Sequence, residues 1–265
     1  MAAIPIHDPL DPRVAAFLDI RERDLTGRHG LFVAEGEVVL RVLASPASLC
    51  RPVAALIADR RLTSQADVIA ALPPEAPVYV ASQPVIDRIA GFPLHRGILA
   101  LGEKPAPASL DEILAAAPED AVVVVACGIG NHDNMGGIFR AAAAFGASAV
   151  LLDRYCCDPF YRKAIRVSVG AVLRTPMVAG QAAEAMVDGL RDAGFRVLAM
   201  SPGATAPLHL VTRGGRVAIV LGSEGPGLPA RLLERCESVA IPMSGGFDSL
   251  NVATAGAIAL HHFTR

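Results

Sequence analysis

Short apolar runs alternate with helical patterns along the first hundred residues, as is typical of an α/β domain. The strand-like runs are rich in β-branched and small apolar residues, whereas the helical stretches place apolar residues three and four positions apart. The predicted strands are 31–36, 53–58, 76–81 and 97–102, and the predicted helices are 37–43, 63–71 and 84–90. We therefore predict a small α/β domain over residues 1–105.

The rest of the chain repeats this alternation, but its strand-like runs are apolar on both faces. Such runs are typical of a parallel sheet that helices cover on both sides. The predicted strands are 121–127, 147–153, 195–200, 217–222 and 238–242, and the predicted helices are 136–145, 161–173, 182–193, 229–236 and 249–262. A second α/β domain is thus expected over residues 121–265, with residues 106–120, which contain prolines and a short helical pattern, as the linker.

Composition places the chain among globular proteins, with 52% hydrophobic and 19% charged residues. No apolar run approaches the ~20 residues that span a membrane, and the amino terminus lacks the basic start and apolar core of a signal peptide. The five cysteines are odd in number and form no CxxC pair, so we expect neither a disulfide framework nor a metal site, and a cytoplasmic location. The net charge of −2 neither indicates nor excludes a nucleic-acid partner.

Three loops that follow predicted strands are rich in glycine, asparagine and acidic residues. They read "CGIGNHDNMGGIFR" from Cys127, "GSEGPG" from Gly222 and "PMSGGFDSLN" from Pro242. In parallel sheets, ligands bind outside the carboxyl ends of the strands. We therefore expect the functional site in these loops.

A nicotinamide-dependent oxidoreductase is one interpretation of the first loop. Gly128 and Gly130 match part of a dinucleotide fingerprint, but the third glycine is missing, and "GSEGPG" lacks the Lys-Ser/Thr of a phosphate-binding loop. Asn131, Asp133 and Asn134 are also common turn and cap residues, so this loop alone does not require a function.

Two polar residues are harder to explain by structure alone. Arg140 lies in the first half of an otherwise apolar helix, where the helix dipole does not favour a cation, and its fixed donors suit phosphate or ribose oxygens. In the third loop, Ser249 or Asp248 is expected to cap the last helix. Asn251 is then left over in the first helical turn and needs another partner.

Together, three motifs resemble those of a known family. Asn134-x-Gly136-x-x-x-Arg140, then "VLGSEGPGL" from Val220, then "IPMSGGFDSLNVATAGAIAL" from Ile241 are similar to the signatures of the SpoU (TrmH-type) RNA 2′-O-ribose methyltransferases. The resemblance covers residues 121–265, and residues 1–105 look, more weakly, like the RNA substrate-binding domain that often precedes them. It implies a SPOUT fold with a trefoil knot, S-adenosylmethionine as cofactor, ribosomal or transfer RNA as partner, and a homodimer.

The resemblance also implies roles for individual residues, and no metal. Arg140 would be catalytic, because an arginine stabilises the alkoxide that develops on a ribose 2′-hydroxyl. The other implied catalytic residues are Asn134, Glu224, Ser249 and Asn251; the cofactor-binding residues are Met200, Ser201, Gly222, Glu224, Ile241, Ser249 and Leu250; and the RNA-binding residues are Lys163, Arg166 and Ser168.

One departure and one alternative accompany the resemblance. Family members commonly have Asp-Pro shortly before the motif asparagine, whereas Asn131-His132-Asp133 stand here, and we interpret His132 as a loop residue without a catalytic task. The alternative is an RNA-binding protein that keeps the fold without catalysing, which the presence of all the motif residues together disfavours. The small residues of the last helix, such as Gly256, are expected at close helix contacts in the core or in a dimer interface.

Overall fold

The computed structural model describes residues 3–18, 30–245 and 248–264, and the chain divides into two compact units. Met1–Pro105 and Phe160–Arg174 form the first unit, while Ala106–Pro159 and Thr175–Arg265 form the second. The expected linker, residues 106–120, thus belongs to the second unit, and residues 160–174, expected in the second domain, belong to the first.

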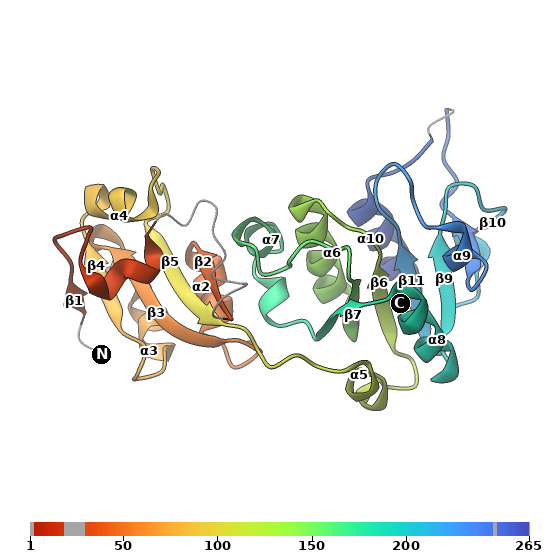
Figure 1. Ribbon diagram of the computed structural model, residues 1–265, viewed down its shortest axis with the longest axis horizontal. Coiled ribbons are helices and arrows are strands. Elements are labelled where there is room, and N and C mark those ends of the chain that lie inside the picture. Colours follow the sequence, from red (N-terminus) through yellow and green to blue (C-terminus); the bar gives the residue numbers. More distant parts are fainter. Residues whose placement is uncertain (1–2, 19–29, 246–247, 265) are drawn as a thin grey trace. The chain divides into compact units, whose positions relative to one another are not determined.

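The first unit contains a mixed five-stranded sheet, in the order β1-β4-β3-β5-β2 (Figure 1). β5 runs antiparallel to β2 and β3, whereas β4 runs parallel to β3 and β1. The strands are β1 Ile4–Pro5, β2 Leu31–Glu35, β3 Arg51–Ala58, β4 Val78–Ala81 and β5 Ile98–Glu103, and the α-helices are α2 Glu37–Leu43, α3 Ala66–Ala71 and α4 Gln83–Ala90. Only β1 has no counterpart among the predicted strands, because two residues carry no periodic signal.

Helix α7 (Arg162–Val167) joins the first unit although it lies far along the sequence. Arg162 Nη1 donates to the Glu35 carboxylate at 2.6 Å, and Glu35 is only 8% exposed. The predicted helix 161–173 is too long, because Val169 (φ 55°) and Gly170 (φ 82°) adopt left-handed conformations that end the helix before the short 3₁₀ turn Ala171–Leu173.

The second unit is built on a parallel seven-stranded sheet, in the order β10-β12-β9-β11-β6-β7-β8, which confirms the predicted fold class. Neither edge strand was predicted, because only Val178 of the five residues of β8 is buried and β10 has only two residues. The strands are β6 Val122–Ala126, β7 Ala149–Asp153, β8 Met177–Gln181, β9 Arg196–Met200, β10 Ala206–Pro207, β11 Val217–Leu221 and β12 Glu237–Ala240.

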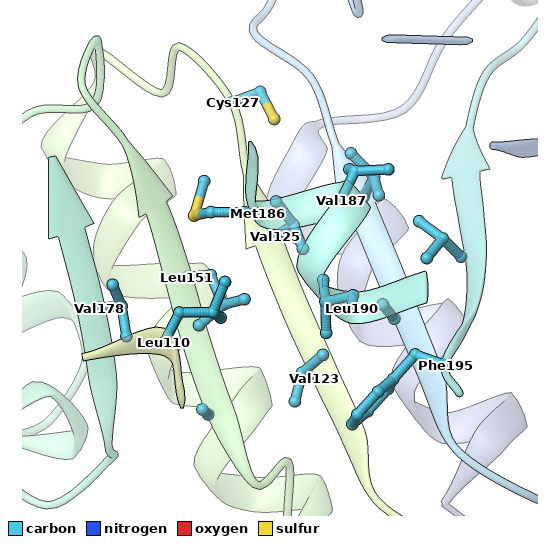
Figure 2. Packing of buried hydrophobic residues seen from close by; sticks show 14 of the residues in the cluster. Leu110, Val123, Val125, Cys127, Leu151, Val178, Met186, Val187, Leu190 and Phe195 are labelled. Atoms are coloured by element: carbon cyan, nitrogen blue, oxygen red, sulfur yellow. The ribbon is translucent and has the colours of Figure 1, made fainter. Parts of the chain in front are cut away.

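Helices pack on both faces of this sheet (Figure 1). They are α5 Leu110–Ala116, α6 His132–Phe145, α8 Ala183–Asp192, α9 Ala230–Leu233 and α10 Val252–Phe263. On one face, alternate strand residues such as Val123 and Leu151 pack against Leu110 of α5 and against Met186 and Leu190 of α8 (Figure 2). This burial of Leu110 anchors the segment that was expected as a linker.

On the other face, α6 and α10 lie side by side and are close enough to require small residues. A Cβ added at Gly137 would lie 2.7 Å from the Cβ of Ala253, and one added at Gly256 would lie 2.8 Å from Leu221 Cδ1 of β11. Gly256 therefore serves packing within the chain. The trefoil knot that the resemblance implies stays a prediction.

Side chains also form hydrogen bonds with the ends of helices. Ser109 and Glu112 form a capping box at the start of α5. Arg216 donates to the carbonyl oxygens of Ala117 at 2.8 Å, Ala193 at 3.0 Å and Pro118 at 3.2 Å. One guanidinium thus satisfies carbonyl groups that the ends of α5 and α8 leave without helical partners.

None of the described helices is long and apolar enough to cross a membrane. Within the same residues, no group of three or more His, Cys, Asp or Glu side chains is arranged to hold a metal ion. All five cysteines are free thiols.

Candidate active site

A cavity of about 720 Å³ opens at the carboxyl ends of β9, β11 and β12 and at the start of α10, all within the second unit. This is the edge of a parallel sheet at which ligands are expected. The seven residues predicted to bind the cofactor all line it: Met200, Ser201, Gly222, Glu224, Ile241, Ser249 and Leu250.

The loop after β11 shapes one wall of this cavity. It folds back on itself, with Gly227 N donating to Ser223 O at 3.1 Å. A Cβ at Gly222 would lie 2.7 Å from both Gly227 C and Leu228 N, so only glycine allows this close approach of backbone to backbone. The wall therefore consists largely of main chain, with Glu224 as its one acidic side chain.

Asn251 connects the three motifs at the cavity. Its Nδ2 donates to Asn134 Oδ1 at 2.7 Å and to Glu224 Oε1 at 3.2 Å. Its Oδ1 accepts from Ala253 N at 3.0 Å and from Thr254 N at 3.2 Å, so Asn251 is also the N-cap of α10. The expectation that Ser249 or Asp248 caps this helix is wrong, because one asparagine both caps it and bonds to the other two motifs.

Asn134 is held in place by the fold of the first motif. Asn131 caps α6 by accepting from Asp133 N at 2.7 Å, which places Asn134 in the first turn of the helix, where it is 6% exposed. His132 is the first residue of α6 and not a loop residue.

Asp153, which is not among the predicted site residues, contacts the loop that leads into the first motif. It ends β7 at 7% exposure, and its Oδ1 accepts from Gly128 N at 2.9 Å and from Tyr155 N at 3.0 Å. The carboxylate thus ties the loop after β6 to the turn after β7. The available signal was a lone acidic residue at the end of an apolar strand.

Arg140 is not brought to the cavity of its own chain. It is exposed and does not line the cavity. Six residues of α-helix place it about 9 Å along the axis and about 120° around it from Asn134. Ser249, by contrast, lies on the cavity wall beside Glu224.

The predicted RNA-binding residues lie on or just after α7, in the first unit. Lys163 and Arg166 are exposed, and Arg166 Nη1 lies 3.8 Å from Glu35 Oε2. Ser168 is 2% exposed, and its hydroxyl donates to Ile165 O at 2.8 Å and accepts from Val172 N at 3.4 Å. Its burial argues for a structural role and against direct contact with RNA.

The thiols close to these loops are structural. Burial raises the pKa of Cys156 to about 12 and raises the pKa of Cys127 further. Cys156 Sγ donates to Ala126 O at 3.3 Å and accepts from Ile129 N at 3.4 Å. Both thiols are therefore protonated at neutral pH and are poor nucleophiles.

Comparisons with known proteins agree with this geometry. The model of the SpoU rRNA Methylase family matches residues 121–261. The chain is 40% identical to uncharacterized tRNA/rRNA methyltransferases of Mycobacterium bovis and of Mycobacterium tuberculosis H37Rv, over 98% of this chain and 91% of each relative.

Two solved structures share the fold. A crystal structure of an RNA 2′-O ribose methyltransferase has a TM-score of 0.78 at 27% identity, covering 98% of this chain and 97% of the other. An AdoMet-bound rRNA methyltransferase from Sinorhizobium meliloti has a TM-score of 0.82 at 22% identity, with the same coverage.

Proposed function

Because this chain belongs to the SpoU rRNA methylase family, we propose that it transfers a methyl group from S-adenosylmethionine to a ribose 2′-hydroxyl of ribosomal or transfer RNA. One observation carries the proposal: the seven residues expected to bind the methyl donor line a single cavity, beside the Asn134, Asn251 and Glu224 hydrogen bonds. The related RNA 2′-O ribose methyltransferase structure supports the choice of the ribose oxygen.

The lining of the cavity suits this donor. Leu221, Leu228 and Val252 offer apolar surface for an adenine ring, and the backbone around Gly222 offers donors and acceptors for its edge. Glu224 supplies a negative charge to a cationic ligand. When bound, the donor supplies an electrophilic methyl carbon.

The remaining chemistry falls to the chain's own residues. A ribose hydroxyl is a weak nucleophile, so it must be positioned in line with the methyl carbon. As its oxygen bonds to that carbon the methyl–sulfur bond breaks, and the hydroxyl proton passes to solvent while negative charge develops on the oxygen. The guanidinium of Arg140 would stabilise that oxygen and hold an adjacent phosphate. Asn134 would hold Asn251 in place, and Asn251 would keep Glu224 oriented in the site.

We further propose that a homodimer completes the site. Arg140 is exposed and does not line the cavity of its own chain, so we place the arginine that acts on the acceptor there on a second copy. Lys163 and Arg166 are proposed to contact RNA phosphates, since both are exposed.

The first test is Arg140→Ala. We expect the affinity for S-adenosylmethionine, measured by calorimetry, to stay within about twofold, because Arg140 does not line the cavity. Methyl transfer to rRNA and tRNA should fall by about 100-fold or more, as for the loss of other transition-state donors. Unchanged turnover would remove Arg140 from the mechanism.

The second test is a mixture of Arg140→Ala with Glu224→Ala. If Arg140 acts on the partner's site, mixed dimers have one intact site, and random assortment restores about a quarter of the wild-type rate. If Arg140 acts within its own chain, every site carries a lesion and mixing restores nothing.

The position of the methyl group tests the substrate. Mapping 2′-O-methylated nucleotides in RNA from cells with and without the gene should reveal a ribose that loses its methyl group. A methyl group missing from a base would contradict ribose methylation. Failure to bind S-adenosylmethionine at millimolar concentration would favour the non-catalytic RNA-binding protein instead.

A further inference from the structure

A second cavity, of about 650 Å³, lies in the same unit and has no role in the proposed chemistry. It opens at the carboxyl ends of β6 and β7 and at the segment after β8, whereas the methyl-donor cavity lies over β9, β11 and β12. The two cavities share Ser223, Pro226 and Gly227 in the loop after β11. The two cavities are therefore neighbours, separated by one loop.

Tyr155 lines this cavity and lies in a turn that hydrogen bonds hold in place. The residue is 71% exposed, so core packing does not explain why an aromatic ring lies there. Its backbone N–H donates to the buried Asp153 carboxylate at 3.0 Å, and the neighbouring Arg154 N donates to Gln181 O at 2.9 Å. The ring is thus offered to solvent on a fixed main chain, as a stacking surface requires.

Two arginines accompany the tyrosine. Arg154 is exposed, and its side chain has no acidic partner among the described residues. The Arg231 side chain is 70% exposed and forms an ion pair with Glu184 at 2.5 Å. The Glu184 side chain is 27% exposed and also lines the cavity, but Arg231 keeps most of its side chain in water, so the pair is partly screened and a phosphate can compete for the guanidinium.

An aromatic ring beside two guanidinium groups fits a nucleotide better than an apolar ligand or a metal. Proteins that bind single-stranded nucleic acid combine basic side chains along the phosphates with aromatic rings on which bases stack. Recognition of RNA by stacking requires unpaired bases.

We propose that the second cavity holds a nucleotide that neighbours the methylated one in a single-stranded segment of RNA, with its base stacked on Tyr155 and its phosphates contacted by Arg154 and Arg231. This inference rests on the proposed RNA methyltransferase function, and it adds that the methylated site lies in an unpaired segment.

The test compares Tyr155→Ala, Tyr155→Phe and Arg231→Ala in the full chain. The matched control is Arg235→Ala, because Arg235, just after α9, also pairs with an acidic residue of α8, Asp188 at 2.7 Å, and does not line the cavity. Binding of a fluorescein-labelled single-stranded RNA of mixed sequence is followed by anisotropy. Binding of S-adenosylmethionine is followed by calorimetry.

Loss of stacking in Tyr155→Ala should weaken RNA binding by about five- to 150-fold. Tyr155→Phe should bind like the wild type, Arg231→Ala should bind more weakly than Arg235→Ala, and donor affinity should not change in any variant. RNA that carries 5-iodouridine should cross-link to the peptide that contains Tyr155. Equal RNA affinity in Tyr155→Ala and wild type, or a loss in Tyr155→Phe as large as in Tyr155→Ala, would overturn the stacking role.

The two proposals fail in different ways. If the wild type methylates RNA but Tyr155→Ala binds and modifies it equally well, only the second cavity is misassigned. If the wild type transfers no methyl group to cellular RNA yet loses RNA affinity in Tyr155→Ala, the reaction is wrong and the nucleotide site stands.

Discussion

Replacing Asn251 with alanine removes two different interactions at once. The side chain caps α10 through Ala253 N and Thr254 N, and it donates to Asn134 and Glu224. Asn251→Ala therefore weakens the helix and opens the contact between the motifs.

The magnitude follows from burial. Loss of the cap costs about 1 kcal/mol. Asn134 is 6% exposed, so its Oδ1 is left without its donor at a cost of about 1–3 kcal/mol. Glu224 is exposed, and its carboxylate exchanges the hydrogen bond for water. Together these losses lower the free energy of local opening of α10 by about 2–4 kcal/mol.

Asn251→Ser separates the two parts, since serine caps helices about as well as asparagine but offers no amide donor to Asn134. We expect the free energy of local opening of α10 to fall by about 1–3 kcal/mol in Asn251→Ser and by about 1 kcal/mol more in Asn251→Ala. Hydrogen exchange of α10 peptides, measured by mass spectrometry in the full chain, reports this opening without assuming that both units unfold together. Equal protection in the two variants would show that the cap contributes nothing. If Asn251→Ser kept wild-type protection, the contact with Asn134 would contribute nothing.

Three further changes probe the rest of the second unit. Gly137→Ala should destabilise the second unit by about 1–3 kcal/mol in urea titrations, because the new methyl group meets the short side chain of Ala253. An unchanged midpoint of urea unfolding would show that α6 and α10 separate freely. Arg216→Ala should lower the free energy of unfolding by about 1–3 kcal/mol and expose the end of α5 to hydrogen exchange, because the carbonyl of Ala117 and two others lose their donor. Unaltered exchange at the end of α5 would contradict this prediction. Burial raises the pKa of Cys156 from its ordinary 9.0 to about 12, so the folded state holds its proton to higher pH than the unfolded state does. The stability that this contributes is complete below pH 9 and is lost as the pH rises toward 12, by up to about 1.4 kcal/mol per pH unit. Cys156→Ser should flatten that slope in urea titrations above pH 9, and an unchanged slope would assign the alkaline loss to other groups.

The strands and helices were predictable where burial is uniform. β6 and β11 are buried along their whole length, so their apolar runs identified them directly. β8 lies at the sheet edge with one buried residue, and α9 spans only Ala230–Leu233 of a predicted eight-residue helix, so neither left a reliable pattern. Amphipathic periodicity reports burial, and it fails where burial is partial.

The association of α7 with the first unit was not predictable from periodicity. It depends on Glu35 and Arg162, whose positions differ by 127 in sequence. Glu35 is the last residue of β2 and looks like an ordinary strand end, and Arg162 looks like a solvated helix residue. Only the fold shows that a nearly buried carboxylate needs that guanidinium.

The site itself was predicted through its motifs, and the structure changes the reason why those motifs occur together. Asn251 was expected to be surplus to the helix cap, yet the cap and the link to Asn134 and Glu224 use opposite ends of one amide. The donor-cavity wall from Ser249 to Val252 therefore leads directly into α10, whose N-cap is Asn251. Because α10 packs on α6 through Gly137, the geometry of the cavity depends on helix packing outside it. A small residue at the contact between α6 and α10 thus constrains the site although it does not line the cavity.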